Sequence, residues 1–130
     1  MKTSFRQHSQ HTRRGAVTVE FAMVFPVILL MFVGSLEMAS LHYARHTMGY
    51  AAYEAARKAA IPGSSPTVGQ TAGMQQLNLV GLGTGAQVIV TQTSTAVTAE
   101  VQIPSSNFSW GPISYFVNFI AKERCTLLRE

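Results

Sequence analysis

The chain has 130 residues, of which 47% are hydrophobic and only 12% charged, about half the charged share of a typical soluble protein. This length allows one domain rather than two, and the low charge excludes a chain that is disordered throughout. Because Cys125 is the single cysteine, an internal disulfide scaffold and a metal site built on several thiolates are both excluded.

The net charge of +4 belongs to the first residues of the chain. Lys2, Arg6, Arg13 and Arg14 carry it without any acidic neighbour, and the remaining basic residues are balanced by the glutamates. A nucleic-acid-binding protein needs basic residues clustered on its folded surface. The balanced remainder offers no such cluster, so we expect no nucleic-acid partner.

Residues 16–36 predict a transmembrane helix. They contain one charged residue, Glu20, and the central run 25–33 is apolar on every helical face. A helix of this length spans about 31 Å, which matches the hydrocarbon core of a bilayer. Pro26 removes one backbone hydrogen bond, a loss that membrane helices tolerate.

The flanking charge predicts the orientation of this helix. The basic residues precede the apolar segment, so the positive-inside rule keeps the N-terminus in the cytoplasm and carries the C-terminus across the membrane. A cleaved signal peptide is the alternative, but Val33–Ser35 is a poor small-x-small cleavage site and the apolar segment is long.

The junction at Gly15 carries the most specific motif. Residues 13–21 read Arg-Arg-Gly-Ala-Val-Thr-Val-Glu-Phe, with Glu20 at the fifth position after Gly15. This pattern resembles the processing site of type IV prepilins. The segment that continues to Arg57 resembles TadE-like proteins, the pseudopilins of the tight-adherence (Flp, type IVc) pilus system. A carboxylate near the membrane boundary is costly, which favours a functional reading over a solvated interfacial Glu20.

The resemblance implies a processing and assembly mechanism. A prepilin peptidase would cut after Gly15, remove the leader 1–15 with its charges Arg13 and Arg14, and leave Ala16 as the new N-terminus. Glu20 would then form an assembly salt bridge with the α-amine of a neighbouring subunit or of its own chain. The implied partners are the peptidase, other pilin or pseudopilin subunits, the inner-membrane assembly platform and membrane lipid. The implied location is the bacterial cytoplasmic membrane, with possible incorporation into an extracellular pilus.

The apolar segment is predicted to continue as an extramembrane helix, residues 37–62. Paired alanines recur every four residues from Ala51 to Ala60, and alanine is the best helix former. Glu54 and Lys58 predict an i,i+4 ion pair. Pro62 and Gly63 stop the helix, which therefore runs from about residue 16 to residue 60. The alanine rows favour close packing, most simply against the head of the same chain.

Residues 63–130 predict a small head domain. Ser65 as N-cap and Pro66 at the first position begin a short helix that reaches about Val80, followed by a glycine-rich connector at 81–85. Alternation of apolar and polar residues predicts strands at 87–93 and 97–103, joined by a turn at 94–95. A short amphipathic helix is expected over 113–120 and a final strand over 124–128. The fold class is therefore α+β: a long transmembrane helix continuing into a pilin-like head with a short antiparallel sheet.

The head offers little that would support catalysis or cofactor binding. His42 and His46 have the spacing of two zinc ligands, but no carboxylate or cysteine near them in sequence completes a set, so we expect no metal. Cys125 is expected to be a small buried hydrophobe or to form an intermolecular disulfide. We therefore expect no enzyme and no cofactor, but a pilin-like structural subunit that acts in pilus assembly and surface attachment. The alternative is an uncleaved single-pass anchor that displays a small extracytoplasmic interaction domain.

Overall fold

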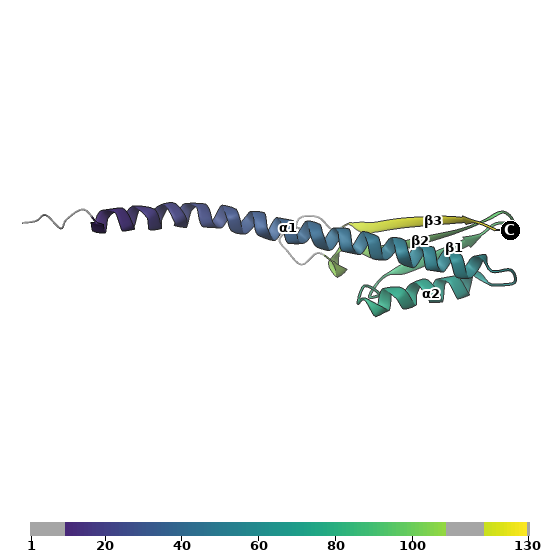
Figure 1. The fold of residues 1–130 in the computed structure, drawn as a ribbon. Coiled ribbons are helices and arrows are strands. Elements are labelled where there is room, and N and C mark those ends of the chain that lie inside the picture. The colour runs from purple at the N-terminus through teal and green to yellow at the C-terminus, as the bar shows by residue number, and fades with distance from the viewer. Residues whose placement is uncertain (1–9, 109–118, 130) are drawn as a thin grey trace, which may run out of the picture. The chain divides into compact units, whose positions relative to one another are not determined.

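The computed structural model describes the backbone of residues 10–108 and 119–129, and the side chains of residues 15–108 and 119–129. A long helix, α1 (Gln10–Ala60), comes first (Figure 1). Tertiary contacts divide the chain into two compact units between Leu36 and Glu37. α1 contributes to both.

The described part of the N-terminal unit is the first part of α1, which contains the apolar run. Within the described residues, one helix, from Gly15 to Ala60, is long and apolar enough to cross a membrane, and none of its most apolar window is buried. α1 passes through Pro26 and begins at Gln10, six residues before the predicted start. Gly15 lowers helix propensity without ending the helix, since each residue added to an existing helix gains a backbone hydrogen bond.

The second unit is an α+β head, as predicted. It contains the second half of α1, a helix α2 (Pro66–Leu79) and an antiparallel sheet of β1 (Gln87–Gln92), β2 (Ala96–Pro104) and β3 (Ile120–Leu128), in the order β1-β2-β3. A single-turn 3₁₀ helix, η1 (Ser105–Asn107), follows β2. Val90 of β1 pairs with Ala99 of β2, which pairs in turn with Cys125 of β3. Two-residue periodicity thus located β1 and β2 to within about one residue at each end.

One face of the sheet packs on the two helices to form the core. Along β2 every second residue is buried, from Val97 to Ile103, and the residues between them are only partly exposed. On α1 the buried face consists almost entirely of alanine: Ala44, Ala51, Ala52, Ala55, Ala56 and Ala59, together with Met48. Alanine lets the helix backbone approach the sheet closely. The prediction that the alanine rows pack against the head of the same chain is confirmed.

α2 packs against the same part of α1 through two glycines. A Cβ atom on Gly73 would lie 3.1 Å from the Ala55 Cβ and 3.0 Å from a methyl group of Val88. Gly69 is closer still to α1. Glycine is a poor helix former, so neither residue favours α2 through its own local propensity. In the fold they allow two helices to lie in backbone contact.

The third strand begins earlier than the sequence predicts. β3 starts at Ile120, where Pro104 is its partner, and not at Arg124. Of the predicted helix over 113–120, residues 113–118 lie outside the described part of the chain. Its last position is wrong, because Ile120 belongs to a strand. Residues 121–124 read Ala-Lys-Glu-Arg, which have low strand propensity. Pairing with β2 overrides that local preference.

The last turns of α1 carry an ion pair that differs from the predicted one. Glu54 accepts two hydrogen bonds from Arg57, at 2.9 and 3.0 Å, rather than pairing with Lys58 at i,i+4. The Arg57 guanidinium lowers the pKa of the Glu54 carboxyl, and the nearby charge of Lys58 adds to that effect. The planar guanidinium matches a carboxylate with two parallel bonds, which an ammonium group cannot do.

Candidate processing and assembly site

The predicted cleavage bond lies on an open stretch of α1. Gly15 and Ala16 are both exposed, and a Cβ atom on Gly15 would meet nothing within 4 Å. The bond is helical here, whereas we expect a protease to bind an extended segment. Glycine reduces the free-energy cost of leaving the helix by roughly 1 kcal/mol relative to alanine. The local sequence therefore makes this one of the easiest bonds of α1 to unwind.

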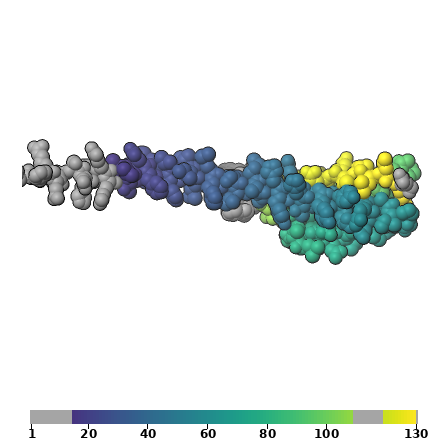
Figure 2. All heavy atoms as spheres, viewed as in Figure 1, coloured from purple at the N-terminus to yellow at the C-terminus, as the bar shows by residue number. Residues whose placement is uncertain are grey.

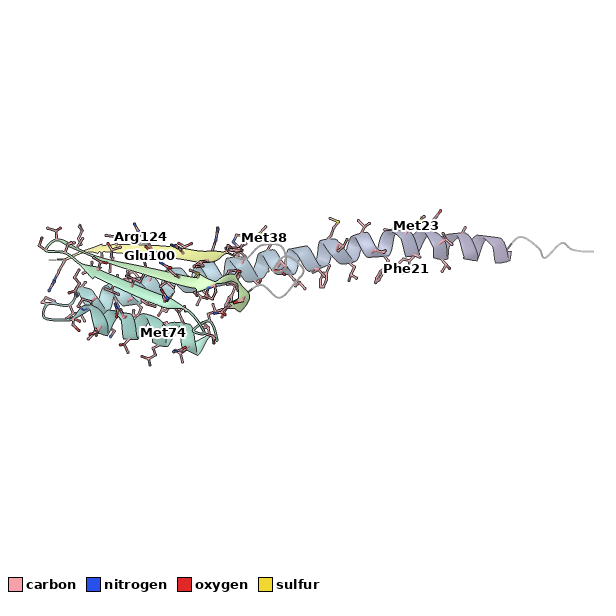
Figure 3. All side chains as sticks on the ribbon, turned by 180° about the vertical axis from the view of Figure 1, so that it is seen from behind. Phe21, Met23, Met38, Met74, Glu100 and Arg124 are labelled. Carbon is pink, nitrogen blue, oxygen red and sulfur yellow. The ribbon has the colours of Figure 1, made fainter. Side chains whose placement is uncertain are left out.

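Glu20 lies one helical turn after Ala16, on the same side of α1. Positions four apart are neighbours on a helix surface. Glu20 is exposed, as are the apolar side chains around it, Val17, Val19 and Phe21. Phe21 is labelled on α1 in Figure 3. Its ring contacts that of Phe25, with centroids 5.5 Å apart. Exposed apolar groups surround this carboxylate. In lipid or in a protein interior, a partner would have to neutralise its charge.

The sequence leaves Glu20 few partners of its own. Glu20 and Glu37 are the only Asp, Glu, Lys or Arg residues between Ala16 and Ala44. Arg13 and Arg14 lie in the first turns of α1, and their side chains are outside the described residues. If the leader is removed, the cation nearest to Glu20 along the chain is the new α-amine of Ala16.

The head brings His42 and His46 to a hollow that the sequence did not reveal. The hollow has a volume of about 420 Å³ and is lined by His42, Arg45, His46, Gly49, Tyr50 and Glu123. Glu123 comes from β3, far away in sequence, and could be found only once its strand was located. Even so, in the described part of the chain no three His, Cys, Asp or Glu side chains are grouped as a metal site requires.

Two other polar groups of the head have positions that the local sequence does not indicate. Glu37 is nearly buried at the start of the second unit, with 6% of its surface exposed. Gln92 of β1 donates hydrogen bonds to the carbonyl oxygens of Ala59 (2.7 Å) and Ser64 (3.3 Å), which lie at and just beyond the end of α1. Neither residue type signals such a role by itself. Cys125 is half-buried, on the side of β3 that faces the core.

Comparison with known proteins supports the resemblance at this site. The family model of TadE-like proteins matches residues 15–57, about a third of the chain, starting at Gly15 itself. No curated protein and no solved structure matches the chain. The matched segment comprises the apolar helix, Glu20 and most of the alanine face that packs against the head. The resemblance to TadE-like proteins of the tight-adherence pilus system is therefore confirmed over residues 15–57.

Proposed function

We propose that this chain is a pilin-like structural subunit, a pseudopilin, that acts in assembly of a tight-adherence type IV pilus and in surface attachment. A prepilin peptidase on the cytoplasmic side of the membrane cuts between Gly15 and Ala16. The observation that carries this proposal is the juxtaposition of an open, helix-weakening Gly15 with Glu20, five residues on, in an apolar helix that matches the TadE-like family.

The chemistry of the new N-terminus accounts for the role of Glu20. Cleavage creates an α-amine on Ala16, which is positively charged at neutral pH because its reference pKa is near 8. In an apolar environment the amine and the Glu20 carboxylate are each costly when unpaired. Pairing between adjacent subunits therefore favours one axial offset between their helices. A contact with this offset, repeated from subunit to subunit, is heterologous, and heterologous contacts are the kind that build filaments.

The orientation follows from the leader charges. Arg13 and Arg14 stay in the cytoplasm with the peptidase-facing end of α1, and the head lies on the outer side of the membrane. The proposed partners are the peptidase, other pilin subunits and the assembly platform in the membrane. In this proposal the head acts through its folded surface.

The test is the N-terminus of the mature protein. The full chain is expressed with its prepilin peptidase and extracted from membranes, and mass spectrometry is expected to find Ala16 first. Gly15→Val is the matched variant, because a bulky β-branched side chain at the scissile position should leave the precursor uncut. A mature chain that keeps Met1 would instead favour the permanent membrane anchor, and a chain that starts after Ser35 would favour an ordinary signal peptide.

A further inference from the structure

The phenylalanines and tyrosines of α1 follow a single line along the helix. In sequence they are separated by 4, 7, 11, 7 and 3 residues, and each separation is close to a whole number of helical turns. At about 100° per residue, they all fall within roughly 80° of the helix circumference. The residues of this aromatic line are Phe21, Phe25, Phe32, Tyr43, Tyr50 and Tyr53.

In the apolar part of α1, the phenylalanines of the line are exposed. Phe21, Phe25 and Phe32 have between 48% and 62% of their surfaces exposed. Figure 3 shows Phe21 and Met23 on opposite sides of the helix, and Leu30 follows Met23 on that opposite side. A lone helix in a membrane meets lipid on every side. Contact with lipid therefore does not explain why phenylalanine keeps to one side.

In the head, the tyrosines of the line are on the side of α1 that faces away from the core. Tyr43, Tyr50 and Tyr53 have between 46% and 57% of their surfaces exposed, whereas the buried side consists almost entirely of alanine. Figure 2 shows α1 at the surface of the head, with β3 along one side of it and α2 along the other. Arg57 continues the line, and its charge is already matched by Glu54 at 2.9 Å. Tyrosine and arginine are the residues that often dominate binding energy at protein interfaces.

An aromatic belt at the membrane surface does not account for these tyrosines. Such belts lie in the headgroup layer, which is about 5–7 Å thick on each side of the bilayer core. Tyr50 and Tyr53 follow Leu36, the end of the predicted span, by about 21 and 26 Å along the helix. Both lie well beyond the headgroup layer, so the belt leaves them unexplained.

We propose that the aromatic line packs lengthwise against a second long helix, which crosses the same membrane and continues beyond it beside the head. A partner that contacts Phe32 lies in the bilayer, where backbone hydrogen bonding restricts a single crossing segment to a helix. A partner that also contacts Tyr50 extends past the membrane surface. Separations built from 3, 4 and 7 residues are typical of helices that pack along their length at a small crossing angle.

The chemistry of the line defines the surface of its partner. Within the membrane the line offers apolar rings, and Glu20 lies about 100° around the helix from Phe21. The proposed salt bridge of Glu20 is therefore directed to another side of α1. Beyond the membrane, His46 and the tyrosine hydroxyl groups add hydrogen-bonding groups to the line. The partner helix is thus expected to be apolar in the bilayer and to present hydrogen-bonding groups outside it.

The test is site-specific photo-cross-linking of the full chain in its native membranes. A benzophenone analogue of phenylalanine replaces Phe32 or Tyr50, and mass spectrometry identifies the captured peptide. Leu30 and Leu79 are the matched control positions: both are exposed, but Leu30 is about 200° around the helix from Phe32 and Leu79 ends α2. We expect Phe32 and Tyr50 to capture the same chain, which has a membrane-spanning helix of its own, several-fold more efficiently than the controls.

A second variant tests whether the line acts as one contact. Tyr50→Ser, combined with the photoreactive residue at position 32, should reduce capture several-fold, whereas Leu79→Ser should not. Both side chains are exposed, so neither variant removes core packing. Capture of different chains from Phe32 and Tyr50, capture of lipid alone from Phe32, or equal capture from Leu30 would each overturn the proposal.

The proposed processing can be tested separately from this contact. The inference rests on the proposed membrane placement of α1 but not on cleavage after Gly15. Gly15→Val, which retains the leader, should therefore give the same cross-links as the parent chain. Normal cutting without these cross-links would refute the lengthwise contact and leave the processing intact, whereas cross-links in a chain that is never cut would do the reverse.

Discussion

Gly69 of α2 lies directly against the backbone of Ala55 in α1. A Cβ atom placed on Gly69 would come 2.5 Å from the Ala55 carbonyl oxygen and 2.8 Å from the Cβ of Ala59. No side chain fits at that distance without moving one helix, and a backbone oxygen cannot turn aside as a flexible side chain can. The close pairing of α1 and α2 therefore depends on the hydrogen atom that glycine has in place of a side chain.

The first prediction concerns this helix pairing. Gly69→Ala should destabilise the head by about 1–3 kcal/mol, because overpacking a close contact forces backbone shifts. Gly49→Ala is the control: Gly49 is also inside a helix, but an added Cβ there meets nothing within 4 Å. That variant should stabilise the head by roughly 0.5–1 kcal/mol through helix propensity. Thermal unfolding of the detergent-solubilised chain, monitored by its susceptibility to protease, measures the stability of both variants. Equal effects of the two variants would contradict the role assigned to Gly69.

The second prediction concerns the end of α1. Gln92 donates to the carbonyl oxygens of Ala59 and Ser64, which the helix cannot satisfy internally. Gln92→Ala should therefore destabilise the head by about 1 kcal/mol and increase protease cutting near residues 61–64. Thr91→Ala, at the next and exposed position of β1, is the matched control. Unchanged cutting near residues 61–64 in Gln92→Ala would show that water replaces the amide without loss.

The third prediction is a pH dependence of the head. The Arg124 guanidinium, 2.7 Å from Glu100, and then the Gln102 amide lower the pKa of the Glu100 carboxyl below its usual range. Because the folded pKa is the lower one, the pair stabilises the head fully above the unfolded pKa of about 4.3, and this contribution disappears as pH falls through the folded pKa.

Melting curves at several pH values provide the measurement. The loss of thermal stability below about pH 4.3 should be smaller in Glu100→Gln than in the parent chain. Both groups face solvent, so the difference should be small and should shrink further at high salt. Parallel pH profiles for the two chains at low salt would show that the ion pair contributes nothing.

The fourth prediction separates processing from assembly at Glu20. Glu20→Gln should still insert into the membrane and be cut after Gly15, because removing a charge lowers the cost of insertion. Pilus assembly should fail, since the Ala16 α-amine would have no carboxylate in its apolar surroundings. Gel mobility measures cutting and electron microscopy measures pili in the same strain. Normal cutting with normal pili would make Glu20 an interfacial residue without a role in assembly.

The elements with a strong local signal could be predicted from sequence. The apolar run of α1, the Ser65–Pro66 start of α2 and the alternation of β2 each depend on neighbouring residues alone. The motif at Gly15 and Glu20 is equally local, so its resemblance to a prepilin processing site is visible in the sequence alone. The start of α1 was predicted six residues late and that of β3 four residues late, because weak local preference there is overridden by backbone hydrogen bonding.

Only the tertiary structure decided the relationships between distant segments. Gly69 is a poor helix former by itself, and only the fold places Ala55 against it. Gln92 is one residue of a strand, and only the fold places its amide at the end of α1. Glu123 has no helical or catalytic signature, yet β3 places it on the hollow that His42 and His46 also line. The physical reason is the same in each case: the short-range sequence signal records backbone conformation, whereas close approach and polar contact depend on which elements the sheet and helices bring together.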